Sequence, residues 1–94
     1  MLTVQIEHPI RDYQAWKAAF DRDPAQRHAS GVRRYRISRP LGDDLYVIIE
    51  LDFDERDAAE KFVVTMRSIW KQVEGTIMVG PQVRIVDCVE QHDY

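Results

Sequence analysis

Hydrophobic and polar residues alternate strictly at the start of the chain, over residues 2–7. Such alternation predicts a β-strand with one buried face, and Pro9 ends it. Asp12 belongs to a residue type favoured at helix N-caps, and it begins a segment with helical periodicity that Pro24 stops. The apolar stripe of this predicted helix is aromatic and consists of Tyr13, Trp16 and Phe20.

Residues 32–39 and 45–53 are two further runs that contain β-forming side chains. The second run is the most apolar predicted strand, and its side chains alternate between two faces. Positions 40–44 between the runs contain Pro, Gly and Asp residues, which is the composition of a turn. The two runs are therefore predicted to form a β-hairpin with a short loop.

A longer amphipathic segment follows, and Asp54 is its predicted N-cap. The apolar positions recur at helical spacing and predict a helix that extends to Val73. Residues 76–79 fit either a loop or a short extra strand. Residues 83–89 predict a last strand, and residues 90–94 predict a polar tail.

The predicted order of elements is β-α-β-β-α-β, which is that of the ferredoxin-like split βαβ arrangement. This α+β fold has a four-stranded antiparallel sheet with two helices on one face, and the first and third strands lie at its centre. The predicted second strand suits an edge position, because charge on an edge strand discourages unwanted pairing. Its charged residues are Arg33, Arg34, Arg36 and Arg39. Residues 1–94 are expected to form one domain, since two domains would need a longer chain.

Composition narrows the class of protein. The net charge is −3, from 13 basic and 16 acidic residues, which argues against a general nucleic-acid-binding protein. No apolar run has the length of a membrane span, and the first residues lack the features of a signal peptide, so a cytoplasmic protein is expected. Cys88 is the single cysteine, which excludes an internal disulfide, and it is expected to be a buried small hydrophobic residue.

The sheet face away from the helices is predicted to mix charged and apolar side chains. Arg36, Glu50 and Asp52 fall on this face together with Tyr46 and Ile48. One interpretation is a solvated face with scattered ion pairs, each of which contributes little. The other is a homodimer in which two such faces stack. The sequence alone leaves both interpretations open.

His8 is the histidine best placed for chemistry. It follows Ile6 on the apolar face of the first predicted strand, where it either acts as a general base or bonds neighbouring backbone groups. His28 and His92 lie in polar segments and are expected to be solvated. The three histidines share no metal-ligand spacing, so no metal site is predicted. The chain also shows no nucleophile–base pair and no glycine-rich phosphate loop.

Three segments carry a likeness to a known superfamily: EHPIRDYQAWKAAF at 7–20, ASGVR at 29–33 and LDFD at 51–54. With its order of elements, the chain resembles the dimeric α+β barrel superfamily, nearest the antibiotic-biosynthesis-monooxygenase-like group of small bacterial proteins of uncharacterised activity. The likeness covers nearly the whole chain. It is specific for the fold but not for the activity, because fold does not settle function.

The resemblance implies a homodimer with facing sheets, and a ligand pocket between the sheet and helices of each subunit. The residues implied to line this pocket are Trp16, Phe20, Phe62 and Met66, with Trp70 at its mouth. His8 and Tyr35 lie near it as candidate catalytic groups. The same aromatic side chains would equally fill a solid core, since a stripe at helical spacing needs no ligand to explain it.

The activities within this superfamily differ in their demands on the protein. A haem-degrading member would supply a histidine on the second helix, and residues 54–73 contain none, so no haem and no other cofactor is expected. A cofactor-independent monooxygenase needs only an apolar pocket, a base and hydrogen-bond donors for an aromatic or polyketide-like substrate. The alternatives are an aromatic polyketide cyclase and a non-catalytic homodimer that binds a metabolite or serves as an accessory protein. Whether the protein is an enzyme stays open at this point.

Overall fold

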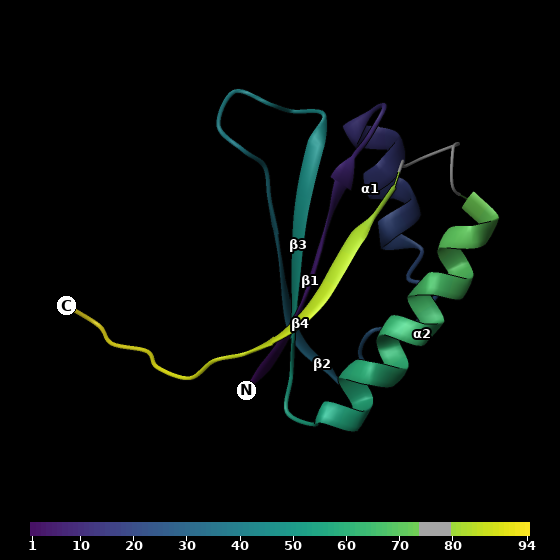
Figure 1. Ribbon diagram of the computed structural model, residues 1–94. Coiled ribbons are helices and arrows are strands. Elements are labelled where there is room, and N and C mark those ends of the chain that lie inside the picture. The colour runs from purple at the N-terminus through teal and green to yellow at the C-terminus, as the bar shows by residue number, and fades with distance from the viewer. Residues whose placement is uncertain (74–79) are drawn as a thin grey trace.

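A computed structural model describes residues 1–73 and 80–94 of the chain (Figure 1). The elements are β1 (Leu2–Pro9), α1 (Tyr13–Asp21), β2 (Val32–Ser38), β3 (Tyr46–Phe53), α2 (Arg56–Val73) and β4 (Gln82–Asp87). This order confirms the predicted β-α-β-β-α-β arrangement. The segment at 76–79, for which a loop or an extra strand was possible, lies outside the described residues.

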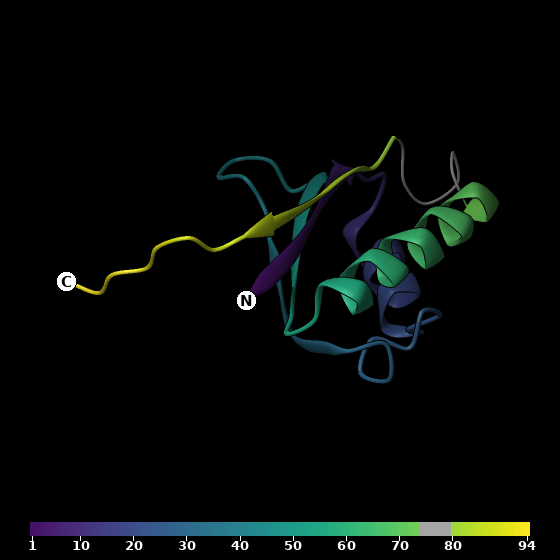
Figure 2. The same cartoon turned by 60° about the horizontal axis from the view of Figure 1, so that its bottom comes forward.

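The four strands form one antiparallel sheet in the order β2-β3-β1-β4. Strands β1 and β3 are therefore central, as the ferredoxin-like fold requires. Val4 of β1 pairs with Leu51 of β3 on one side and with Ile85 of β4 on the other. Figures 1 and 2 show both helices on the same side of this sheet, which leaves its other face uncovered.

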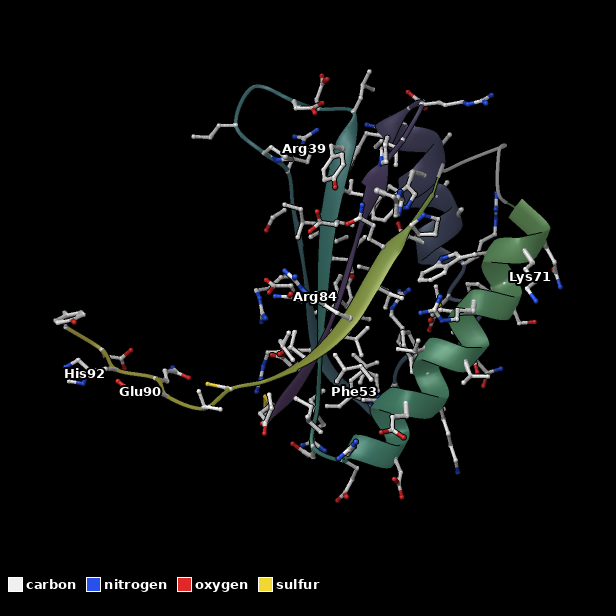
Figure 3. The ribbon with its side chains drawn as sticks, in the orientation of Figure 1. Arg39, Phe53, Lys71, Arg84, Glu90 and His92 are labelled. Carbon is white, nitrogen blue, oxygen red and sulfur yellow. The ribbon has the colours of Figure 1, made fainter. Side chains whose placement is uncertain are left out.

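The hydrophobic core lies between the sheet and the helices. Side chains of the central strands are fully enclosed there, among them Val4, Val47, Leu51 and Phe53. Figure 3 shows Phe53 on the α2 side of the sheet, where its ring lies 5.4 Å from that of Phe62 between centroids. This packing follows from the period-2 pattern of the strands and the 3.6-residue pattern of α2.

Of the two predicted N-caps, the one at α1 is confirmed and the one at α2 is wrong. Asp12 caps α1, because its carboxylate accepts a hydrogen bond from the Ala15 backbone N–H at 2.8 Å. The prediction of Asp54 as the cap of α2 was wrong by one residue, since the Glu55 carbonyl accepts the first helical bond, from Ala59 N–H, at 3.2 Å. Strand β3 continues through residue 53, so Asp54 lies in the bend between sheet and helix, and its carboxylate lies 3.5 Å from Arg33.

The end of β4 is a second correction. The strand stops at Asp87, which pairs with Leu2 at the start of β1, so no partner strand exists beyond it. Val89, predicted to belong to the strand, is 92% exposed, and Cys88 is exposed instead of buried. The remaining residues leave the body of the molecule as an extended tail (Figures 1 and 2).

Gly31, just before β2, brings the chain close to α2. Its φ of +103° is a conformation that L side chains rarely adopt. A Cβ at this position would lie 3.2 Å from the Cβ of Ala58, which is closer than side chains normally pack. The close approach at Gly31 therefore sets the spacing between the start of β2 and the first turn of α2.

Candidate functional site

A cavity of about 310 Å³ lies between the sheet and the two helices. This volume is at the lower end of the range for small-molecule sites, about 300–1,000 Å³. Its floor includes Ile6, Ile49 and Leu51 from β1 and β3, and most of its wall is apolar. The core on this side of the sheet is therefore not filled solid.

The five residues that the resemblance placed in a pocket all lie on the wall of this cavity. They are Trp16, Phe20, Phe62, Met66 and Trp70. Trp70, expected at the mouth, is only 6% exposed. Trp16 and Phe20 pack against each other with ring centroids 5.2 Å apart, so these two residues of the α1 stripe form a continuous part of the wall.

The two helices pack against the sheet in different ways, and this difference accounts for the cavity. Helix α2 packs directly against β1, β3 and β4. Helix α1 approaches the sheet through the large aromatic rings of Trp16 and Phe20. Bulky side chains separate backbones, and those of α1 extend along the side of the cavity without filling it.

His8 also lies on the cavity wall, near the end of β1. Its side chain is 2% exposed, and its ring lies edge-on to Trp16 with 6.1 Å between centroids. The Nδ1 atom is 2.9 Å from the backbone carbonyl oxygen of Pro9, which can only accept a hydrogen bond, so Nδ1 donates. In the neutral ring Nε2 then carries a lone pair, and within the described part of the chain no group donates to it.

Burial lowers the pKa of His8 below its usual value near 6.5, an effect that outweighs the opposing contribution of the hydrogen bond to Pro9. At neutral pH the ring is therefore uncharged, with Nε2 able to accept a proton. This protonation state is the one that a general base needs before it acts.

Tyr35, the other candidate catalytic residue, is not among the described residues of the cavity wall. A register shift between Val32 and Arg34 places Tyr35 opposite Leu51, on the helix side of the sheet. There its ring packs edge-on against Phe20, with centroids 5.1 Å apart, and 43% of the residue is exposed. The structure thus brings His8 and the predicted pocket residues together at one cavity. Tyr35 lies on the edge strand β2 and contacts Phe20, but it is not among the described wall residues.

The polar residues of the wall were not predicted from the sequence, and they include Arg22, Arg27 and Gln72. Arg27 is held firmly, because its Nη1 donates to the Phe20 carbonyl oxygen at 2.9 Å and its guanidinium carbon lies 3.8 Å from the centre of the Phe20 ring. In the sequence, the segment that carries these arginines has the composition of an ordinary polar connection. Pro24 and Ala25 within it also line the cavity, and these two less polar residues were the one sequence feature that could have indicated a cavity contact.

The uncovered sheet face is a hydrogen-bonded network around Asp52. Its carboxylate accepts bonds from the Thr3 hydroxyl at 2.7 Å, from Arg34 at 2.9 Å and from Arg36 at 3.2 Å. Burial alone would raise the pKa of Asp52, but the hydrogen bonds from Arg36, Thr3 and Arg34 lower it to about 2. Figure 3 shows Arg84 on this side too, where it donates to Gln5 at 2.8 Å.

Residues 1–73 and 80–94 contain no group of three His, Cys, Asp or Glu side chains that could hold a metal ion. No helix in this part of the chain is long and apolar enough to cross a membrane.

Comparison with known proteins shows the fold. No protein-family model matches the sequence, and no curated protein matches it. Among solved structures, a candidate antibiotic biosynthesis monooxygenase from Nitrosomonas europaea superposes with a TM-score of 0.71 at 16% identity, over 96% of this chain and 100% of that one. SnoaB, a cofactor-independent oxygenase from Streptomyces nogalater, gives 0.72 at 11% identity, over 96% and 94%.

A third similar structure is a dimeric ferredoxin-like protein from an uncultured marine organism. Its TM-score is 0.65 at 8% identity, and both chains are covered completely. These likenesses confirm the ferredoxin-like fold seen in antibiotic biosynthesis monooxygenase-like proteins. At such identities they leave the chemistry to be argued from the residues of this chain.

Proposed function

We propose that this protein is a cofactor-independent monooxygenase that binds a small aromatic substrate in the cavity and uses His8 as general base. The observation that carries the proposal is the state of the His8 ring. Its Nδ1 donates to the Pro9 carbonyl, burial keeps the ring neutral, and Nε2 is the remaining basic atom in a mostly apolar cavity.

The proposed reaction starts with proton transfer from a phenol or enol to Nε2 of His8. The resulting electron-rich anion reacts with O₂, which inserts one oxygen atom into the substrate and leaves the other in water. At an activated methylene the balance is CH₂ + O₂ → C=O + H₂O, so the substrate supplies all four electrons and no other reductant is needed. The apolar wall excludes water from the anion, which keeps it reactive.

The comparisons support this reaction class without reaching the substrate. SnoaB is described as a cofactor-independent oxygenase, and its fold extends over nearly the whole of this chain. The wall also suits a flat aromatic molecule, because Trp16, Phe62 and Trp70 line the same cavity.

The test uses phenols and enolisable aryl ketones, with anthrone as the first probe because its enol form is a phenol. Purified protein is expected to consume one O₂ per anthraquinone formed. His8→Ala should lower the rate by ~10²–10⁴, the usual loss for a general base, while circular dichroism stays unchanged. His28→Ala is the matched control, since that histidine is exposed and is not among the described wall residues.

Other outcomes separate the alternatives. Ring closure or binding without O₂ uptake would replace the proposal by an aromatic polyketide cyclase or a metabolite-binding protein. Full activity of His8→Ala would place the base elsewhere, and Tyr35→Phe would be tested next. An unfolded His8→Ala protein would make the residue structural, and His8→Gln, which retains a polar side chain of similar reach, would then be measured.

We further propose that two copies associate through the uncovered sheet face. Tyr46, Ile48 and Val86 are only half-buried there, beside a network in which charged groups are already paired. Sedimentation at ~10 µM should give twice the 11.1 kDa of one chain. Ile48→Glu should yield monomers, whereas Val64→Glu, on an exposed position of α2, should not. A wild-type monomer would show that the face is simply solvated.

A further inference from the structure

We infer that the ligand of the cavity carries an anionic group, such as a carboxylate, which Arg22 and Arg27 bind at the cavity wall. This inference rests on the proposed function only in that the cavity is a ligand site. It adds a substrate class: an aromatic acid, with its ring against the tryptophans and its charge near the two arginines.

The charge of the cavity wall differs from that of the whole chain. The chain as a whole has more acidic than basic residues, 16 against 13. The cavity reverses this balance, because Arg22 and Arg27 are its charged groups and none of the described wall residues is an aspartate or glutamate. A wall of apolar and cationic side chains favours a ligand that is apolar and anionic.

The nearby carboxylates do not neutralise both arginines. Asp21 bonds Lys17, with 2.6 Å between the ammonium nitrogen and a carboxylate oxygen. Asp23 accepts the Arg27 backbone N–H at 2.9 Å, and the same oxygen lies 3.4 Å from Nη1 of Arg27. Among the described residues, no carboxylate forms an ion pair with Arg22.

Arg27 also has free hydrogen-bonding capacity. A guanidinium group has five N–H donors. Nη1 faces the Phe20 carbonyl and Asp23, whereas Nε and Nη2 have no acceptor in the described part of the molecule. The Arg27 side chain is only 15% exposed, so its position is fixed by packing before a ligand arrives. Such a preorganised fork matches the two oxygens of a carboxylate.

The position of the two arginines supports a shared role. Arg22 follows α1 directly, as its C-cap, and Arg27 lies in the connection that leads to β2. Asp23 and Gln26, between them, both have positive φ angles, 53° and 51°, so the backbone turns sharply here. This turn brings Arg22, Pro24, Ala25 and Arg27 to the same cavity.

The test compares 2-naphthoate with 2-naphthamide, which has nearly the same shape and no charge. Both tryptophans of the protein, Trp16 and Trp70, line the cavity, so quenching of intrinsic fluorescence reports binding there. We expect naphthoate to bind about tenfold more tightly at low salt, as for one charge-assisted hydrogen-bonded contact. The preference should shrink at high salt because of screening.

Variants assign the preference to residues. Arg27→Met and Arg22→Met should each reduce the preference for naphthoate, measured as the ratio of the naphthoate and naphthamide affinities so that a general change in the cavity wall cancels. Arg67→Met is the matched control, because this exposed arginine of α2 is lost with the same change in charge and is not among the described wall residues. Arg22 is exposed, so its variant keeps the test valid even if Arg27→Met fails to fold.

The outcomes separate this inference from the proposed function. Equal affinities for the two probes, or a preference that both arginine variants retain, would overturn the inference and leave the cavity as a ligand site. Absence of binding by naphthoate, naphthamide and 2-naphthalenesulfonate would overturn the ligand site itself, and the inference with it.

Discussion

Phe53 and Phe62 offer a direct test of whether the cavity is open in solution. Both side chains are buried, and their rings are in contact at 5.4 Å between centroids. Phe62 also lines the cavity, whereas Phe53 is not among the described residues of its wall. The two residues therefore have the same chemistry and burial but differ in what surrounds them.

The loss of stability expected for each alanine variant follows from the contacts that its ring makes in the folded protein. For Phe53→Ala, with packing on all sides, a loss of about 4–5 kcal/mol in the free energy of unfolding is expected, at the upper end for this substitution. One side of Phe62 already faces empty space and forms fewer dispersion contacts, so Phe62→Ala should cost only about 2–3 kcal/mol. The difference of about 2 kcal/mol corresponds to roughly 8–16 °C in melting temperature for a domain of this size.

Thermal and urea denaturation of the wild type and the two variants, at one protein concentration, measure this difference. Phe53→Leu and Phe62→Leu are milder versions, to be used if Phe53→Ala does not fold. Equal losses at the two positions would refute the reasoning, because they would mean that side chains fill the cavity in solution and that Phe62 is ordinary core.

Two further predictions concern stability. Asp52→Asn should cost about 1–2 kcal/mol at pH 7, because three hydrogen-bond donors lose a carboxylate whose side chain is 6% exposed. The folded pKa, about 2, lies below the ordinary 3.8, so this stabilisation is present above pH 3.8 and is lost as the pH falls through 2. An undiminished difference from wild type at pH 2 in urea denaturation would contradict the prediction. Gly31→Ala should destabilise by about 1–3 kcal/mol through strain and contact with Ala58, and a thermal melt should show a smaller loss for Gly42→Ala, whose Cβ would meet open space.

The elements could be predicted from the sequence because their patterns have different periods. Alternation in β1 and β3 and the helical stripes of α1 and α2 each fit one type of structure. The order of these elements then leads to the ferredoxin-like sheet, with β1 and β3 at its centre. Asp12 could be predicted as a cap because its interaction is local, with a backbone group three residues away.

The incorrect predictions concern features that depend on parts of the chain distant in sequence. The end of β4 is set by the start of β1, so the β-forming character of Val89 could not extend the strand. Cys88 is exposed for the same reason. Asp54 has the right chemistry for a cap, but the length of β3 and the bend after it place Glu55 at the helix start.

The candidate site was partly predictable on the same grounds. Its aromatic wall lies on the apolar faces of α1 and α2, and the helical spacing of apolar residues in the sequence predicts these faces. Its arginines lie after α1 and in a connection that turns toward the cavity through positive φ angles at Asp23 and Gln26. A short polar segment has no periodic pattern from which its course could be predicted, so the two wall arginines could be identified only from the structure.

The bond between His8 and the carbonyl of Pro9 has a consequence for protein engineering. The acceptor belongs to the main chain, so no side-chain substitution can delete it. Libraries that vary Phe20, Met66 and Ile69 would reshape the cavity while the tautomer of His8 stays fixed. Under the proposed function, the surface that contacts the ligand could thus be varied while the proton acceptor keeps its tautomer, which would make this small domain a suitable scaffold for evolving new substrate preferences.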